Sequence, residues 1–367
     1  MTSNPYKDLP DSAFWRRAVS TAGPSLDPVM STRFGIAATD RVATAGSCFA
    51  QHIARELVGR GCTFLLTEPG PAEQGYGVYP ARFGNIYTPR QLLQLFRRAY
   101  AVFEPAEEAW TRPDGRLVDP FRPQAVPEGF ADPAALRADR DRHLAAVREM
   151  FETCDVLVFT LGLTEAWEAT ADGAVLPLAP GVVAEPAKGV MAEPAKGVMA
   201  EPGHDGFAFR NFTVAEMTAD MARFTTSLRR VNPGARLLLT VSPVPLIATY
   251  EARHVLVSTI ASKAALRVVA EEAMRADPGT DYFPAYEIVT GPQTAARFFA
   301  EDLRSVTAEG VATVMDIFAR HYLGIADAPR PVLARVSRDA RNVAAELDEL
   351  AGVICDEEAI EGSAGRA

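Results

Sequence analysis

The sequence predicts an α/β protein in which a mostly parallel sheet lies between two layers of helices. Short, almost wholly apolar runs such as Asp155–Leu161 (DVLVFTL) and Ala235–Val241 (ARLLLTV) each follow a long helical pattern. Strands that are apolar on both faces and alternate with helices are typical of a parallel sheet covered on both sides. The chain has 367 residues, 48% of them hydrophobic, which is enough to build such a core.

The first predicted strand, Val42–Ala45, breaks at Gly46, and a helical pattern follows at once. Phe49, Ile53 and Leu57 recur at a spacing that places them on one helix face. The other predicted strands are Cys62–Thr67, Asp155–Leu161, Ala235–Val241 and Thr280–Val289. Another helix is predicted to begin at Thr88-Pro89. The remaining predicted helices cover Pro133–Thr153, Thr213–Val231, His254–Arg275 and Val306–Tyr322. This succession predicts a three-layer α/β/α sandwich of the flavodoxin type, in which ligands bind at the carboxyl ends of the strands.

These elements are expected to form a single domain over residues 33–325. An N-terminal extension, residues 1–32, precedes it. Residues 326–367 follow it and are expected to hold a C-terminal helix at Ser337–Ala351 and a frayed tail, EGSAGRA.

Two stretches interrupt the alternation of strands and helices. Residues 102–131 are rich in proline and turn residues, which indicates a long insertion or lid. Residues 181–206 are expected to form a surface loop, lengthened by a tandem repeat of AEPAKGVM within residues 184–199. Two and a half copies of eight residues are too few for a solenoid.

Composition and charge exclude several classes of function. The formal net charge of -10 comes from 37 basic and 47 acidic residues without a basic run, so nucleic acid and anionic membranes are poor prospects as partners. The four cysteines are scattered with no CxxC pair, which fits a reducing cytoplasm better than a disulfide framework. The N-terminus is polar, and no apolar run reaches membrane-spanning length, so a cytoplasmic location is expected. No ligand cluster or phosphate-binding glycine loop appears, so neither a metal nor an organic cofactor is expected.

The segment RVATAGSCFAQHIARELVGRG, Arg41 to Gly61, places Ser47 at the hinge between a strand and a helix. Such a hinge lifts a side chain out of the sheet and directs the first N–H groups of the helix toward a ligand. Ser47 is therefore either a catalytic nucleophile or the cap of the helix, since serine is a common N-cap residue.

The pentapeptide GSCFA at residues 46–50 resembles the GSCFA family, which looks like a branch of the SGNH/GDSL esterase superfamily. The likeness runs from about Arg33 to Tyr322. The further segments that carry it are FGNIYTP (83–89), TLGLTEAW (160–167), VSPVPL (241–246), YFPAYEIV (282–289) and AEDLRSVT (300–307). The resemblance implies a three-layer fold and serine-based acyl chemistry.

Carried over to this sequence, the resemblance implies that Ser47 is the nucleophile and that its own N–H is an oxyanion donor. The second donor implied is the backbone N–H of Gly84, with the Asn85 side chain beside it. The alternative for Gly84 and Asn85 is a plain turn before the next helix, since Gly-Asn is common in turns.

The third donor in the superfamily is an Asn shortly after a Gly at the end of a central strand. Gly162 stands at that place here, but the Asn is absent. Thr164 offers a hydroxyl instead, and Glu165 a base or an orienting carboxylate. The alternative is that both residues start a helix, as a cap and a dipole-matched acid. Trp167 is expected in the core, with a pocket wall as the other option.

The superfamily ends with Asp-x-x-His, whereas this chain has Asp302-Leu303-Arg304-Ser305. Ser305 replaces the imidazole and cannot act as a base at neutral pH. Arg304 is a candidate for binding a carboxylate or phosphate of the substrate. Of the five histidines, His254 is the preferred base, with Asp302 or Glu165 holding its other ring nitrogen. His143 lies in a charged helix and is expected to be solvated.

Two functions from different classes remain open at this point. The first is an ester hydrolase or acyltransferase that forms an acyl-Ser47 intermediate on a small-molecule or carbohydrate ester, an O-acylated sugar or similar polar ester by analogy with the family. The second is a non-catalytic ligand-binding protein that has lost the base, which the Asp302-x-x-Ser305 segment favours. A scaffold that binds partners through the AEPAKGVM loop has little support.

Overall fold

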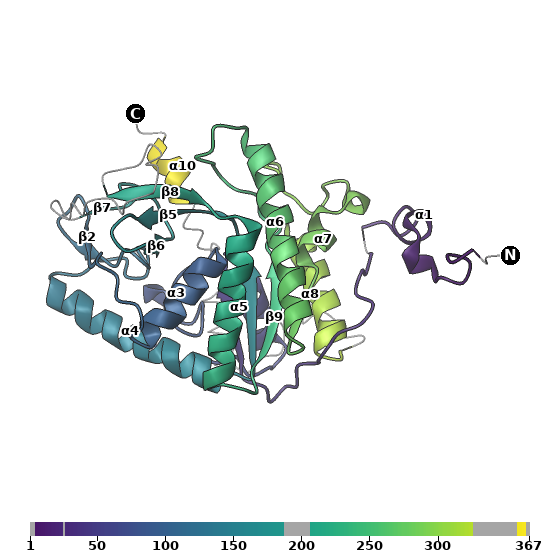
Figure 1. Ribbon diagram of the computed structural model, residues 1–367, viewed down its shortest axis with the longest axis horizontal. Coiled ribbons are helices and arrows are strands. Elements are labelled where there is room, and N and C mark those ends of the chain that lie inside the picture. Colours follow the sequence, from purple (N-terminus) through teal and green to yellow (C-terminus); the bar gives the residue numbers. More distant parts are fainter. Residues whose placement is uncertain (1–3, 25, 187–205, 326–357, 365–367) are drawn as a thin grey trace.

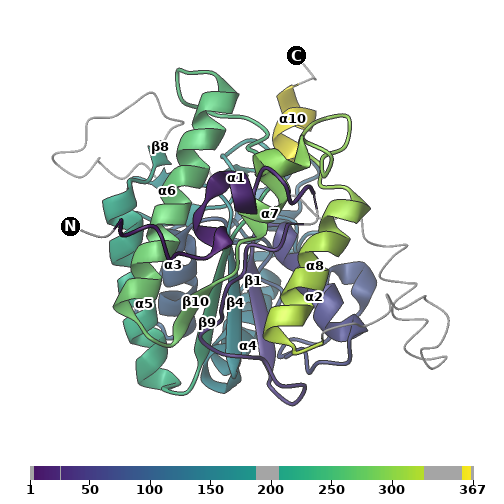
Figure 2. The same ribbon diagram turned by 90° about the vertical axis from the view of Figure 1, so that its right-hand side faces the viewer.

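The computed structural model describes residues 4–24, 26–186, 206–325 and 358–364. At its centre is a parallel sheet with the strand order β1-β4-β9-β10 (Figures 1 and 2). The strands are β1 (Val42–Gly46), β4 (Val156–Leu161), β9 (Arg236–Val241) and β10 (Thr280–Tyr282). The predicted α/β class with a central parallel sheet is confirmed.

Helices cover both faces of this sheet, as Figure 2 shows. One face carries α2 (Phe49–Gly59), α7 (Ala285–Thr290) and α8 (Ala308–Tyr322), and the other carries α3 (Pro89–Ala99), α4 (Pro133–Thr153), α5 (Val214–Val231) and α6 (Val255–Ala276). Val156 and Val158 of β4 pack in the core on the first face, while Leu157 and Phe159 pack in the core on the second. The side-chain alternation of one strand thus supplies two cores, which is why the runs are apolar throughout.

Two predicted strands are shorter in the structure. In Cys62–Thr67, only Phe64 forms a parallel bridge, to Val42, because the N–H of Thr67 turns away to the carbonyl of Pro80. Thr280–Val289 was expected as one strand, which is wrong beyond Tyr282. Pro284 has no N–H to give to a ladder, and it stands at the start of helix α7 instead.

With Phe64 counted at the edge, the strands follow the doubly wound order 2-1-3-4-5. In this order the chain switches direction across the sheet between β1 and β4. Ligands of such folds bind outside the carboxyl ends of the strands at that switch point. The switch point is formed here by Gly46, the last residue of β1, with Ser47 directly after it, and by Gly162, directly after β4.

Two small antiparallel sheets flank the main one. The first combines β2 (Trp110–Thr111) and β3 (Leu117–Val118), both in the predicted insertion, with β7 (Glu185–Pro186) in the repeat-bearing loop. The second combines β5 (Glu165–Ala169), β6 (Val175–Leu176) and β8 (Phe207–Asn211). Their core includes Trp110 and Phe207, which meet edge to face.

The remaining elements are η1 (Asp11–Ala13), α1 (Trp15–Ala18), η2 (Ala72–Gln74), η3 (Pro292–Thr294) and α10 (Glu358–Ala364). Residues 361–364, expected as part of a frayed tail, are helical. The helix predicted at Ser337–Ala351, and the repeat from residue 187 onward, lie outside the described residues.

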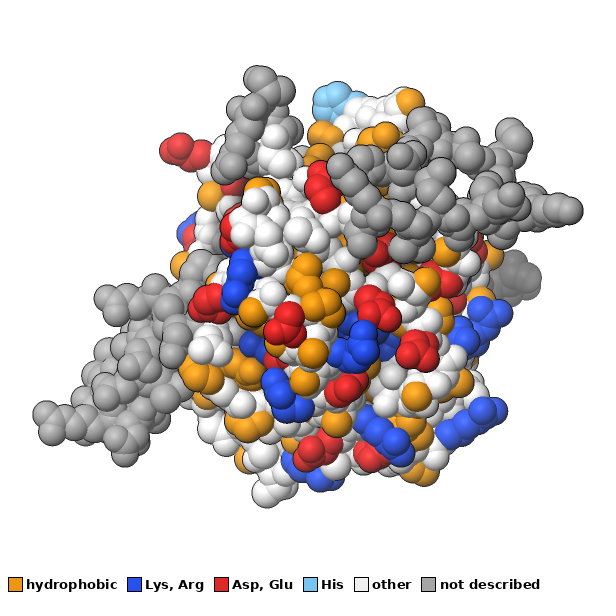
Figure 3. All heavy atoms as spheres, turned by 90° about the vertical axis from the view of Figure 1, so that its left-hand side faces the viewer, with side chains coloured by type: hydrophobic (Ala, Val, Ile, Leu, Met, Phe, Trp, Pro, Cys, Tyr) orange, Lys and Arg blue, Asp and Glu red, His pale blue; other side chains and the backbone are white. Residues whose placement is uncertain are grey.

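Threonine residues cap the N-termini of three helices at or next to the predicted helix starts. Thr88 and Thr213 each form a capping box with a residue three positions on, and Thr307 caps α8. Within the described ranges, no helix is both long and apolar enough to cross a membrane. On the face shown in Figure 3, lysine and arginine side chains are interspersed with aspartate and glutamate.

Candidate functional site

Ser47 lies directly after β1, at the switch point of the sheet. Its N–H donates to the carbonyl of Thr160 at 3.1 Å, which extends the ladder between β1 and β4 by one residue. The expected role of this N–H as an oxyanion donor is therefore wrong for this conformation, because the sheet already uses it.

The hydroxyl of Ser47 is buried, since the residue is only 3% exposed, and it makes no hydrogen bond to any residue that the structure describes. The residue at the N-cap of α2 is Cys48, not Ser47. The alternative that Ser47 only caps the helix is wrong. A buried hydroxyl without a partner is uncommon in native proteins and calls for an explanation.

The segment around Gly84 and Asn85 packs against the Ser47 turn. The N–H of Ile86 donates to the carbonyl of Gly46 at 2.8 Å. The Tyr79 hydroxyl donates to Oδ1 of Asn85 at 2.7 Å and lies 3.3 Å from the carbonyl oxygen of Ser47. Gly84 has a φ of +73°, so a residue with left-handed backbone is required there. The structure thus brings the Gly84-Asn85 segment to Ser47.

Gly162 forms the other wall of the switch point. A Cβ on Gly162 would lie 3.2 Å from Cβ of Ser47 and 2.8 Å from the ring of Tyr87. The carbonyl of Tyr87 accepts hydrogen bonds from the N–H groups of Gly162 and Leu163. Only glycine allows these two neighbours to approach each other so closely.

A lysine reaches this wall from helix α6. Lys263 is 2% exposed, and its Nζ donates to the carbonyl of Gly162 at 2.6 Å. A fully buried lysine is rare in proteins. Lys263 therefore belongs to the buried cluster at Ser47, although its position in the middle of a helix did not reveal this.

Thr164 directly precedes strand β5, which Glu165 starts, so the alternative that these two residues start a helix is wrong. The Thr164 hydroxyl donates to Oδ1 of Asn211 on the neighbouring strand β8 at 2.7 Å, and its N–H donates to Oγ of Ser262 at 3.0 Å. Glu165 accepts hydrogen bonds from the hydroxyl of Thr249 at 2.7 Å and from the N–H of Tyr250 at 3.4 Å. Burial raises the pKa of Glu165, and the hydrogen bond from Thr249 opposes that shift.

His254 lies at the N-cap of α6 and is exposed. Its Nδ1 accepts a hydrogen bond from the N–H of Leu256 at 3.1 Å. The neutral ring then carries its proton on Nε2, so a base role would require His254 to give up this cap. No hydrogen bond of the described residues joins His254 to Asp302 or Glu165.

Asp302, Arg304 and Ser305 lie in an exposed turn. Oδ2 of Asp302 accepts the Ser305 hydroxyl at 2.6 Å, and Oδ1 accepts the N–H groups of Arg304 and Ser305, each at 2.9 Å. The hydroxyl of Ser305 lowers the pKa of Asp302, with the two N–H groups acting in the same direction. The Asp302 carboxylate therefore accepts hydrogen bonds from within its own turn, and its side-chain partner is the Ser305 hydroxyl and not an imidazole. Arg304 faces α10 across a shallow depression that Glu358 and Glu361 also line.

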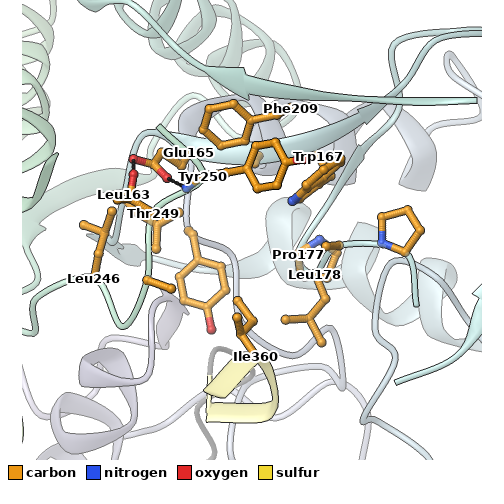
Figure 4. A pocket seen from close by; sticks show the side chains of 15 residues that line it. Leu163, Glu165, Trp167, Pro177, Leu178, Phe209, Leu246, Thr249, Tyr250 and Ile360 are labelled. Carbon is orange, nitrogen blue, oxygen red and sulfur yellow. Dashed lines mark hydrogen bonds between the residues drawn. The ribbon is translucent and has the colours of Figure 1, made fainter. Parts of the chain in front are cut away.

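A deeper cavity of about 420 Å³ opens beside the Ser47 cluster (Figure 4). Tyr87 and Leu163 line it on the side of the switch point, and Glu165 and Trp167 contribute from β5. Trp167 thus forms part of a pocket wall, and the expectation that it lies in the core is wrong. Ser47 itself does not line the cavity. Tyr87 and Gly162 lie between Ser47 and the cavity.

A profile of the GSCFA family matches residues 41–318, more than half of the chain. The chain belongs to the GSCFA family. Neither a curated protein nor a solved structure matches the sequence. Among the residues that the structure describes, no group of three or more His, Cys, Asp or Glu side chains is arranged to hold a metal ion.

The pentapeptide of the GSCFA family is therefore the switch-point turn of this chain, with Gly46 and Ser47 at the end of β1. The structure brings together this turn and the Gly84-Asn85 segment, both of which the sequence had singled out. Sequence reasoning left Lys263 unplaced and missed Asn211, because each is brought to the site by an element that is distant in sequence. The sequence signal for Lys263 was its position among small and apolar residues, in ASKAAL (261–266). A lysine with such neighbours lies on the face of the helix that packs against the sheet.

Proposed function

We propose that this GSCFA protein is a serine-dependent ester hydrolase or acyltransferase of the SGNH/GDSL kind, with Ser47 as the nucleophile. The substrate class is an O-acyl ester of a polar alcohol such as a carbohydrate, and the compartment is the cytoplasm. The observation that carries the proposal is the buried hydroxyl of Ser47 at the switch point of a doubly wound sheet, without a hydrogen-bond partner in the described parts of the chain.

The reaction would proceed in two acyl transfers. A base takes the proton of the Ser47 hydroxyl while Oγ bonds to the acyl carbon, and the ester C–O bond breaks as the alcohol leaves with a proton. Water or a second alcohol then attacks the acyl-enzyme and frees Oγ. Because Ser47 is enclosed, the groups that cover it must move before an ester reaches it.

Lys263 is the base that the buried cluster favours. Its amine bonds the carbonyl of Gly162, whose Cα lies against the side chain of Ser47. A lysine amine serves as the base in serine–lysine hydrolases. His254, the base favoured by the sequence, stays a second candidate.

Labelling with a serine-directed phosphonate tests the nucleophile. The pure protein is expected to gain one adduct by intact mass, and Ser47→Ala is expected to gain none. Ser227→Ala is a matched control, because Ser227 is half-buried on α5 and its hydroxyl donates to the carbonyl of Arg223 in the same helix. An adduct on Ser47→Ala, or none on the wild type, contradicts the proposal.

Two variants identify the base. Lys263→Met keeps the length of the side chain and removes the amine, and it is expected to lower kcat for p-nitrophenyl acetate by about 10²- to 10⁴-fold. Urea unfolding run in parallel separates this loss from a loss of fold, since the amine also holds Gly162. Turnover that survives in Lys263→Met but not in His254→Ala assigns the base to His254.

A non-catalytic ligand-binding protein is the second candidate function. The turn at Asp302 favours it, because the carboxylate is exposed and held by Ser305 instead of orienting an imidazole. This candidate predicts no phosphonate adduct and the same ligand affinity for wild type and Ser47→Ala.

A further inference from the structure

The cavity beside the Ser47 cluster is lined mainly by aliphatic and aromatic side chains. Leu163, Leu178 and Leu246 face it, as do Trp167 and Phe209 (Figure 4). Its volume of about 420 Å³ falls in the range of small-molecule sites. Apolar surface of this kind binds hydrocarbon, because removing such surface from water is favourable.

The charged group in the lining, Glu165, is already engaged. Both of its hydrogen bonds run to the loop that carries Thr249 and Tyr250, and Figure 4 shows them at one end of the cavity. Burial raises its pKa, as expected for a carboxyl group beside an apolar space. Glu165 therefore shapes the end of the cavity and holds the loop in place.

The aromatic residues form a wall and not a cage for a cation. The ring centroids of Trp167, Phe209 and Tyr250 are 5.0 to 6.1 Å apart, and the ring planes are inclined by 48° to 67°. Rings this close contact one another, two of the pairs edge to face and the Phe209–Tyr250 pair tilted, which leaves no room for an ammonium group between them. Their exposed faces are instead available to an uncharged apolar group.

The chain itself places an alkyl group at this cavity. Ile360 of α10 lines it, and Figure 4 shows its side chain directed from the helix toward Leu178 and Pro177. The rest of α10 presents Glu358 and Glu361 to the depression that holds Arg304. Helix α10 thus lies at the rim of the cavity, and its largest aliphatic side chain, Ile360, points into the cavity.

We propose that the cavity binds the hydrocarbon chain of a medium-length acyl ester, and that Ile360 of α10 competes with this chain for the same space. Naming the hydrocarbon as the acyl part rests on the proposed function. Tyr87 lines the cavity and, with Gly162, separates it from Ser47, so a chain bound with its carbonyl end at Tyr87 reaches the nucleophile once these residues move apart. The site would then select esters by acyl length.

Binding is measured by calorimetry on the full chain carrying Ser47→Ala, so that no turnover interferes. The ligands are ethyl butanoate, ethyl hexanoate and ethyl octanoate. Affinity is expected to rise about fourfold per added methylene, as hydrocarbon burial predicts. Equal affinity for the three esters would overturn the proposal.

Filling the cavity should abolish this preference. Ala179→Phe enlarges a small, half-buried residue of the lining and is expected to weaken ethyl octanoate binding by at least about tenfold. Ala171→Phe is the matched control, because Ala171 is exposed and outside the lining. Octanoate binding that is the same in both variants would place the ligand elsewhere.

Removing the competitor should strengthen binding. Ile360→Asp is expected to tighten ethyl octanoate binding about fivefold, since the alkyl group no longer occupies the rim. Ser363→Asp adds the same charge to an exposed position of α10 and is expected to have no effect. Weaker binding in Ile360→Asp would make Ile360 part of the binding wall and refute the competition.

The two proposals fail separately. Length-dependent binding without a phosphonate adduct refutes the esterase and leaves the hydrocarbon site in place. A Ser47 adduct with turnover that is indifferent to acyl length and to Ala179→Phe refutes the hydrocarbon site and leaves the esterase.

Discussion

Gly46→Ala is expected to destabilise the protein by about 4 kcal/mol or more, in the range of severe steric substitutions. Gly46 has a φ of +137°, and a Cβ there would lie 2.3 Å from the carbonyl oxygen of Thr160. That oxygen accepts the N–H of Ser47, so β1 and β4 must separate where the nucleophile is held. The free energy of unfolding in urea measures the loss, and phosphonate labelling measures the displacement of Ser47.

Gly115→Ala is the control for backbone strain without a clash. Gly115 has a φ of +79°, and no atom lies within 4 Å of the position that a Cβ would take. Only the left-handed backbone is therefore penalised, at about 1–2 kcal/mol. If Gly46→Ala loses no more stability than Gly115→Ala, the close approach of β1 to β4 does not constrain the Ser47 turn.

Stability is expected to fall by about 3 kcal/mol between pH 6.5 and pH 4 through His143 alone, at about 1.36 kcal/mol per pKa unit. His143 is buried on α4, and its Nδ1 lies 2.7 Å from Oε2 of Glu68. Burial and the nearby charge of Arg122 lower the pKa of His143 from 6.5 to about 4. The unfolded state therefore takes up the proton first as the pH falls, and acid favours unfolding across that window.

Glu68 extends the acid lability to lower pH. Although burial raises the pKa of Glu68, the hydrogen bond from His143 and the surrounding charges lower it from 4.5 to about 2. The stabilisation from this carboxylate is complete above pH 4.5 and disappears as the pH falls toward 2. His143 is neutral at pH 7, so its contact with Glu68 is a hydrogen bond from an N–H to a carboxylate and not an ion pair.

His143→Asn keeps an N–H donor near the position of Nδ1 and removes the titration. In urea unfolding from pH 8 to pH 4, this variant is expected to lose the His143 part of the pH dependence. His52→Asn is the companion variant, because burial and then Arg55 lower the pKa of His52 to about 4 as well. An unchanged pH profile in His143→Asn would show that the buried imidazole does not titrate as stated.

His143 also illustrates where sequence reasoning ended. Its helix is charged over ADRDRH, so a solvated imidazole was expected, and that expectation is wrong. Arg82 and Arg122 form buried ion pairs with Asp139 of the same helix, and this charged face packs inward beside His143. Local composition does not distinguish a solvated charged face from one that is paired inside the fold.

The sequence by itself determined the order of the strands and helices that form the main sheet and its two covering layers, the main cap positions and the turn that carries Ser47. These features depend on neighbours within a few residues, through side-chain periodicity, N-cap hydrogen bonds and the conformational freedom of Gly46. The tertiary structure alone decided that the Ser47 N–H bonds Thr160, that Lys263 reaches Gly162 and that α10 places Ile360 on an apolar cavity. Such contacts join residues far apart in the chain, and only the packing of the layers brings them within bonding distance.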